Sequence, residues 1–171
     1  FLELLKYTTP GLLVFVSSYF LLKQYLDDKL RSELAAQRNE SVRITLPLKL
    51  QAYERLILLC DRASVPNTLL RIRMPGMTSG ELRGALMLAI SQEFDHNTSQ
   101  QLYVSDTLWK IISLAKNETL SIVSETAPEL DPKSDSSELI DVLFKVLEEN
   151  GQSTMLQKAI VAIRTEAGQL F

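Results

Sequence analysis

The stretch YTTPGLLVFVSSYFLL, Tyr7–Leu22, contains no charged residue, and the organisation of the whole chain is interpreted from it. At a helical rise of about 1.5 Å per residue it reaches ~24 Å, somewhat less than the ~30 Å hydrocarbon core of a bilayer. Lys6 and Lys23 flank the run, and lysine side chains can extend from apolar surroundings to a polar interface. The run therefore predicts a transmembrane anchor over residues 1–26.

Three other structures compete with a membrane span. A cleaved signal peptide has a similar apolar length, but the strongly charged segment Lys23–Arg31 stands where a small-residue cleavage site would be needed. A buried core helix accounts for many apolar runs of this size. An interfacial helix would carry its apolar residues on one stripe, whereas here they surround the helix. The span accounts for the whole run, and the buried helix is the main alternative.

Basic residues near the run predict its orientation. Lys6 is alone before it, whereas five basic residues follow within a short distance: Lys23, Lys29, Arg31, Arg38 and Arg43. The positive-inside rule then places the N-terminus outside and the C-terminal body in the cytoplasm. The single cysteine, Cys60, cannot form an intrachain disulfide, which agrees with a reducing compartment.

Composition excludes one class of partner and favours one class of fold. The chain has 18 Lys and Arg against 21 Asp and Glu, a net charge of −3, so it lacks the cationic balance of a general nucleic-acid binder. With 6 glycines and 6 prolines in 171 residues, turns are too few for a typical β fold. The ~130 residues beyond the span and its extension are enough for one helical domain.

Helical signals follow one another along this body. The alternation of Val42, Ile44 and Leu46 before a proline predicts an extended connector over Ser41–Pro47. After it, apolar residues at spacings of three and four predict helices. Thr78 and Glu81 have the spacing of a capping box that opens a helix ending near Phe94.

Later helices are predicted by the same kind of signal. Ser105 or Asp106 can cap the next helix, which stops before Pro128, and a Pro-containing linker follows. Gly151 is a natural stop for the first of two closing helices. The predicted fold is all-α, an N-terminal transmembrane helix with a cytoplasmic stalk followed by a bundle of about five to six helices. The predicted parts are the anchor over 1–26, a helical stalk and connector over 27–45, the bundle over 46–127, a linker over 128–135 and a C-terminal helix pair over 136–171.

His96 is the only histidine and the natural place to look for chemistry. Glu93 stands three residues before it, a spacing found in carboxylate-bridged metal sites, but such sites need the motif twice and further carboxylates. A second histidine, a cysteine pair and a phosphate-binding loop are all absent from the sequence. We therefore predict no catalytic residue, metal or cofactor. The simpler interpretation is a helix C-terminus, where an imidazole favours the dipole and Asn97 can adopt the left-handed conformation.

Two phrases resemble a known family. The stretches LPLKLQAYERLILLCDR, Leu46–Arg62, and EFDHNTSQQLYVSDTLW, Glu93–Trp109, behind a short N-terminal span are similar to a set of uncharacterised single-pass proteins from Bacteroidetes. The resemblance covers most of the chain and weakens after Pro128. It implies a bacterial inner-membrane location and transfers no catalytic role. It also implies a candidate interaction surface: Tyr53, Glu54, Arg55, Glu93, His96, Asn97, Gln100, Gln101 and Tyr103.

The function predicted from these observations is protein interaction. We expect a membrane-anchored accessory subunit or adaptor of an inner-membrane complex, with a protein partner, no nucleic acid and no small-molecule substrate. Gly11, Ser17 and Ser18 offer small surfaces for packing against another helix in the membrane. One alternative is a soluble helical binding module whose N-terminal helix is buried. Another is an enzyme that uses His96 with Glu93 or Asp95.

Overall fold

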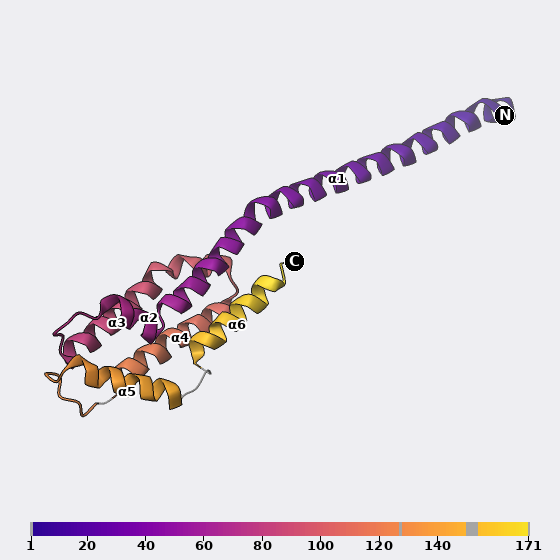
Figure 1. The fold of residues 1–171 in the computed structure, drawn as a ribbon. Helices are drawn as coiled ribbons and strands as arrows, with labels where there is room; N and C mark the ends of the chain where they lie inside the picture. Colours follow the sequence, from indigo (N-terminus) through magenta and orange to yellow (C-terminus); the bar gives the residue numbers. More distant parts are fainter. Residues whose placement is uncertain (1, 127, 150–153, 171) are drawn as a thin grey trace. The chain divides into compact units, whose positions relative to one another are not determined.

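The computed structural model describes residues 2–126, 128–149 and 154–170, with side chains from residue 11 onward. The described residues form helices and no strand, apart from an isolated bridge between Thr78 and Asp135. The all-α prediction is therefore confirmed (Figure 1). The elements are α1 (Leu2–Arg62), α2 (Val65–Ile72), α3 (Ser79–His96), the 3₁₀ helix η1 (Thr98–Tyr103), α4 (Asp106–Glu125), α5 (Ser136–Glu149) and α6 (Met155–Gly168).

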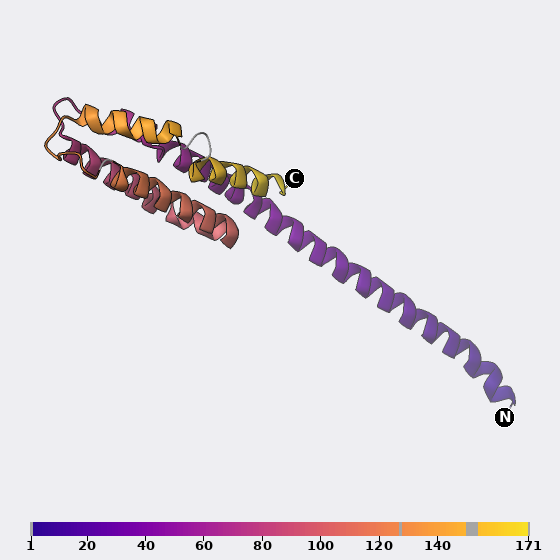
Figure 2. The same ribbon diagram turned by 90° about the horizontal axis from the view of Figure 1, so that it is seen from below.

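The chain divides into two compact units, Phe1–Thr45 and Leu46–Phe171, and α1 belongs to both. We call residues 11–45 the arm and the described residues from Leu46 onward the body. In the body, α4 packs against α3 and α6, and α3 also packs against α2 and α5, as Figures 1 and 2 show. The body is thus a layered helical bundle in which α3 and α4 are central.

The body has one continuous apolar core. Its members come from every α-helix of the body, including the last turns of α1. The two closing helices share it with the rest, so they dock on the bundle and do not form a separate subdomain. Side chains with no more than 1% exposure are Leu56, Leu59, Cys60, Leu82, Leu86, Ile90, Ile112, Val123, Leu139, Leu143, Ala159 and Ile163, among others.

Local capping signals identify two helix starts correctly. Thr78 accepts a hydrogen bond from the Glu81 backbone N–H, and the Glu81 side chain accepts one from the Thr78 N–H, which completes the capping box. The Ser105 hydroxyl accepts a hydrogen bond from the Leu108 N–H at the start of α4. At the end of α3, Asn97 has φ −102°, so the expected left-handed cap is wrong. The stop expected at Gly151 lies outside the described residues.

The segment before α5 is held against the start of α3. The Ser79 N–H donates to the Ser134 carbonyl at 2.9 Å, and the Gly80 N–H donates to the Pro132 carbonyl at the same distance. A Cβ at Gly80 would lie 3.0 Å from Pro132 atoms, so only glycine lets these two backbones approach so closely. This contact aligns α5 alongside α3.

The extended connector predicted over Ser41–Pro47 is wrong, because α1 is helical through it. Pro47 removes only the hydrogen bond that its own missing N–H would donate to the preceding turn, and the rest of the helix is retained. The Thr45 hydroxyl donates to the Ser41 carbonyl at 2.9 Å, which also fits helical geometry. The alternation of apolar residues over this short segment therefore did not predict its structure, because the helices on both sides continue through it.

The predicted transmembrane helix is also wrong. No helix among the described residues is long and apolar enough to cross a membrane. Spanning segments need about 20 predominantly apolar residues, whereas the uncharged run of α1 ends at Lys23 and four further charges follow by Arg31. The single-pass, inner-membrane location and its orientation depended on this span and are corrected with it.

The two other readings of the N-terminal segment change as well. Residues 11–45 are all exposed, so the alternative of a buried N-terminal helix does not describe the arm. The packing role predicted for Gly11, Ser17 and Ser18 depended on a membrane span, for which no described helix is long and apolar enough. A Cβ at Gly11 would meet nothing within 4 Å, and the Ser17 hydroxyl donates to the Leu13 carbonyl of its own helix at 2.7 Å.

Candidate functional site

Glu166 on α6 joins three elements of the body. Its Oε1 accepts hydrogen bonds from the Tyr53 hydroxyl on α1 at 3.0 Å and from the Ser105 N–H at 2.9 Å. Its second carboxylate oxygen accepts from the Ser105 hydroxyl. Lys49, Leu102 and the other neighbours of this carboxylate line a shallow pocket of about 510 Å³. The two phrases of the resemblance, which carry Tyr53 and Ser105, therefore meet at one carboxylate.

The charges at this junction agree with its hydrogen bonds. Burial by itself raises the pKa of Glu166, but donors on Ser105 and Tyr53 and the positive charge of Lys49 outweigh it and lower the pKa overall. Burial, together with the bond to Glu166, raises the pKa of Tyr53 to about 12. Glu166 is thus an ionised acceptor and Tyr53 a protonated donor near neutral pH.

Glu93 forms a second polar junction. Its two carboxylate oxygens lie 3.2 Å from Arg62 Nε and 3.4 Å from Arg71 Nη1. Arg71 also donates to the Arg62 carbonyl at 2.7 Å, which ties the end of α1 to α2. Glu93 and both arginines line a pocket of about 380 Å³. His96 also lines this pocket, and its side chain is exposed. Because both oxygens of Glu93 face arginines, an imidazole would have to compete with them for this carboxylate.

The structure distributes the predicted interaction surface over buried and exposed positions. Tyr53, Asn97 and Gln100 are buried, and the Asn97 amide donates to the Glu93 carbonyl at 2.8 Å, so these three side chains hold the fold together. Glu93 and Tyr103 are half-buried. The exposed members are Glu54, Arg55, His96 and Gln101.

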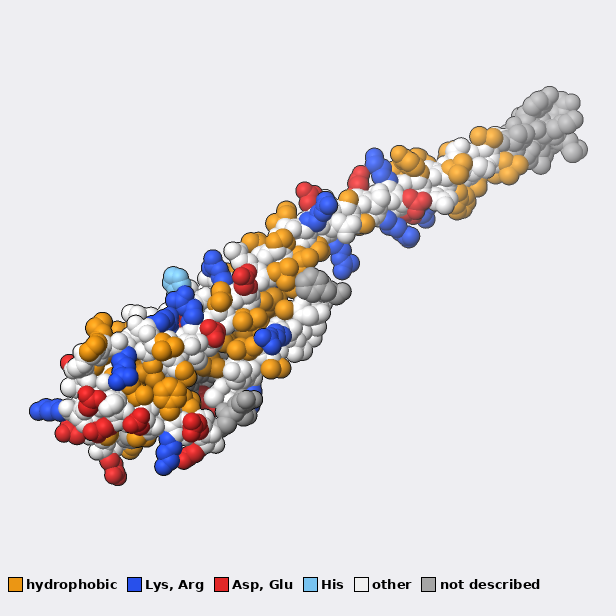
Figure 3. All heavy atoms as spheres, in the orientation of Figure 1, with side chains coloured by type: hydrophobic (Ala, Val, Ile, Leu, Met, Phe, Trp, Pro, Cys, Tyr) orange, Lys and Arg blue, Asp and Glu red, His pale blue; other side chains and the backbone are white. Residues whose placement is uncertain are grey.

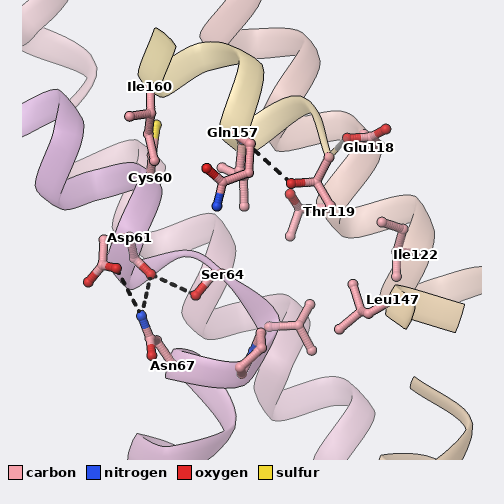
Figure 4. Close-up of a pocket in the computed structure, with 14 residues that line it drawn as sticks. Cys60, Asp61, Ser64, Asn67, Glu118, Thr119, Ile122, Leu147, Gln157 and Ile160 are labelled. Atoms are coloured by element: carbon pink, nitrogen blue, oxygen red, sulfur yellow. Dashed lines mark hydrogen bonds between the residues drawn. The ribbon is translucent and has the colours of Figure 1, made fainter. Parts of the chain in front are cut away.

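Another pocket of the body contains no residue of the predicted surface. It has a volume of about 380 Å³ and lies where α1 and α2 meet α4, the end of α5 and α6 (Figure 4). Figure 4 shows Asp61 held by Asn67, and Thr119 and Gln157 also line the pocket. Burial raises the pKa of the Cys60 thiol to about 12, so this thiol stays protonated and is a poor nucleophile.

Metal binding receives no support from the described residues. Among them, no three His, Cys, Asp or Glu side chains lie close enough together to hold an ion.

The arm carries a row of exposed apolar side chains. Seven apolar side chains recur every three or four residues along it, and each is between 54% and 71% exposed. At 100° per residue they fall within an arc of about 120°, which also contains Lys23 and Glu33. Figure 3 shows apolar side chains continuing along the arm between charged ones. We call this set the arm stripe: Leu12, Phe15, Tyr19, Leu22, Leu26, Leu30 and Leu34.

Sequence reasoning did not find Glu166 or the pocket shown in Figure 4. Glu166 is 61 residues from Ser105 and 113 from Tyr53, so no local spacing could connect them. The spacing of the arm stripe can be read from the sequence. Part of the stripe overlaps the uncharged run, however, where apolar residues lie on all sides of the helix and the spacing of three and four residues does not stand out.

The model of a family of unknown function, DUF7935, matches residues 1–170, nearly the full chain. No curated protein and no solved structure matches it. The match confirms the part of the resemblance that concerns an uncharacterised family.

Proposed function

We propose that this chain, which belongs to the family of unknown function DUF7935, is a helical binding module that recruits a protein partner through the arm stripe. The observation that carries the proposal is the exposure of the whole arm. All residues from Gly11 to Thr45 are exposed, although seven of them are large apolar side chains on one side of the helix.

A helix with this pattern gains most of its stability from packing. Isolated helices are marginal in water, and tertiary or partner contacts with an apolar face normally stabilise them. Exposed contiguous apolar surface on a folded protein marks an interaction site. An amphipathic partner helix would bury the arm stripe by packing its own apolar face against it.

The body supports a scaffolding role for the rest of the chain. Its own apolar faces are paired in one core, and its polar junctions at Glu93 and Glu166 join elements of the body to one another. A folded body attached to an exposed helix suits an adaptor, in which the arm binds the partner and the body is brought to it.

Cross-linking of the natively purified full chain tests the proposal. An amine-reactive cross-linker should join the partner to Lys23 and Lys29 of the arm and leave Lys110 and Lys145 of the body without partner cross-links. All four lysines are exposed, so reactivity alone does not favour the arm. Mass spectrometry of the cross-linked peptides shows which of the arm lysines and which of the body lysines are joined to the partner.

A stripe variant provides the matched comparison. Leu26→Ser with Leu30→Ser should reduce partner recovery at least tenfold. Gln24→Ser with Ala35→Ser changes the opposite face of the same helix and should leave recovery unchanged. Retention of the partner by the stripe variant, or partner cross-links on the body alone, would rule the proposal out.

A further inference from the structure

We propose that the pocket beside Glu93 binds an oxyanion, the carboxylate or phosphate group of an acidic ligand. This pocket, which we call the arginine pocket, has a volume of about 380 Å³ and is formed by the end of α1, α2 and α3. Its polar lining residues are Arg62, Arg71, Gln92, Glu93 and His96. All of them belong to the body, so the inference goes beyond the function proposed for the arm and does not depend on it.

The charges of the arginine pocket favour a negative ligand. The guanidinium groups of Arg62 and Arg71 both lie beside a single carboxylate, that of Glu93. Among the described residues, no other acidic side chain lines the pocket. Two positive charges against one negative charge leave the pocket positive, although the formal net charge of the chain is −3. An anion would therefore bind where the local charge is opposite in sign to that of the whole protein.

The hydrogen-bonding groups of the pocket select the same class of ligand. Both carboxylate oxygens of Glu93 already lie beside arginine nitrogens. Donors remain: Arg62 meets Glu93 through Nε, and its two terminal nitrogens have no hydrogen bond to a described residue. The side chains of Gln92 and His96 have none either within that part of the chain. A guanidinium can only donate, and an amide and an imidazole each keep at least one N–H, so the pocket needs an acceptor.

The two arginines are held in place by the protein itself. Glu93 lies 3.2 Å from Arg62 Nε and 3.4 Å from Arg71 Nη1, and Arg71 Nη2 donates to the Arg62 carbonyl at 2.7 Å. The Glu93 side chain is only 16% exposed, whereas the Arg62 side chain is 56% exposed. The site thus has a half-buried carboxylate as its base and an accessible guanidinium above it.

Arg62 is the group that we expect to hold the oxyanion. A guanidinium directs its N–H groups within one plane and can bind two oxygens of a carboxylate or phosphate at once. Because Nε is already used on Glu93, the two terminal nitrogens are the pair that remains for a ligand. His96 and Gln92 line the same pocket and supply further donors.

His96 makes the arginine pocket directly observable. It is the single histidine of the chain, so its imidazole C2 proton gives one assigned NMR signal. Sodium phosphate added to the full chain at constant pH and ionic strength should shift this signal until it saturates, and sodium chloride should not. The absence of a saturable shift with both phosphate and acetate would overturn the inference.

The acetate titration distinguishes the two sources of the oxyanion. Saturation by acetate as well as phosphate would support a pocket that accepts either group. Saturation by phosphate alone would assign a phosphate group, and saturation by acetate alone would assign a carboxylate.

Variants at Arg62 test which residue holds the anion. Arg62→Gln should weaken anion binding at least about tenfold. Arg62→Lys keeps the charge without the planar pair of donors, so an intermediate affinity is expected, and this variant tests the site if Arg62→Gln does not fold. Circular dichroism shows whether each variant is folded.

Arg164→Gln is the matched control. It removes the same charge from an exposed position of α6 outside the pocket and should leave the titration unchanged. Equal weakening by Arg62→Gln and Arg164→Gln would show that only the net charge of the chain attracts the anion and would overturn the inference.

Discussion

The arm and the body use the same apolar residues in opposite ways. Leu30 in the arm is 58% exposed, whereas Leu82 in the body is 0% exposed, although both lie on apolar faces of α-helices with similar spacing. In the body, each face meets another helix of the same chain. In the arm, no side chain from Gly11 to Thr45 is buried. Helical periodicity therefore identifies an apolar face but does not say whether its partner lies within the chain.

The largest expected effect contrasts these two leucines directly. Leu82→Ala should lower the free energy of unfolding of the body by about 3 kcal/mol, because it removes buried methyl groups and leaves a cavity. Leu30→Ala should change it by less than about 0.5 kcal/mol, as for other exposed positions. Denaturant titration followed by the fluorescence of Trp109, the single tryptophan, measures both. Equal effects would mean that the arm and the body do not unfold as separate units.

A polar junction of the body should show an intermediate effect. Glu166→Gln replaces a carboxylate that accepts three hydrogen bonds by an amide that cannot accept on both sides. The body should lose about 1–2 kcal/mol of stability. Glu33→Gln alters an exposed carboxylate of the arm and is the control, for which no change in the unfolding of the body is expected.

The same carboxylate should make the stability of the body depend on pH. The folded pKa of Glu166 lies below its ordinary value of 4.5, so its contribution is present above that value and is lost as the pH falls through the lower, folded pKa. The stability difference between the wild type and Glu166→Gln should therefore shrink on acidification below about pH 4.5. A difference that stays constant with pH would show that the ionised form of Glu166 does not stabilise the body.

The smallest contrast compares two glycines of α3. Gly80→Ala should destabilise the body by about 1 kcal/mol, because the new Cβ would lie 3.0 Å from Pro132. A Cβ at Gly84 would meet nothing within 4 Å, so Gly84→Ala should stabilise the helix by about 0.5–1 kcal/mol. Thermal unfolding of the two variants gives the signs, and a stabilising Gly80→Ala would show that the Pro132 segment can move away.

Local signals were enough for several elements of this fold. The capping box at Thr78 and Glu81 and the cap at Ser105 each lie within four residues of the groups they satisfy, so sequence alone contained them. Over Ser41–Pro47 a short alternation of apolar residues suggested an extended segment, yet helix on both sides continued through it. At Glu166 the two partner residues, Tyr53 and Ser105, come from distant positions in the chain, and only the tertiary packing of the body brings them together.

By itself the sequence determined that the chain is helical, where several helices begin, and which faces of those helices are apolar, because periodicity and capping act over a few residues. Only the tertiary structure decided which apolar faces are buried. The faces of Leu56 and Leu59 are covered by other helices, whereas the arm stripe is exposed. Burial depends on contacts between residues far apart in the chain, and composition over a short window cannot encode them.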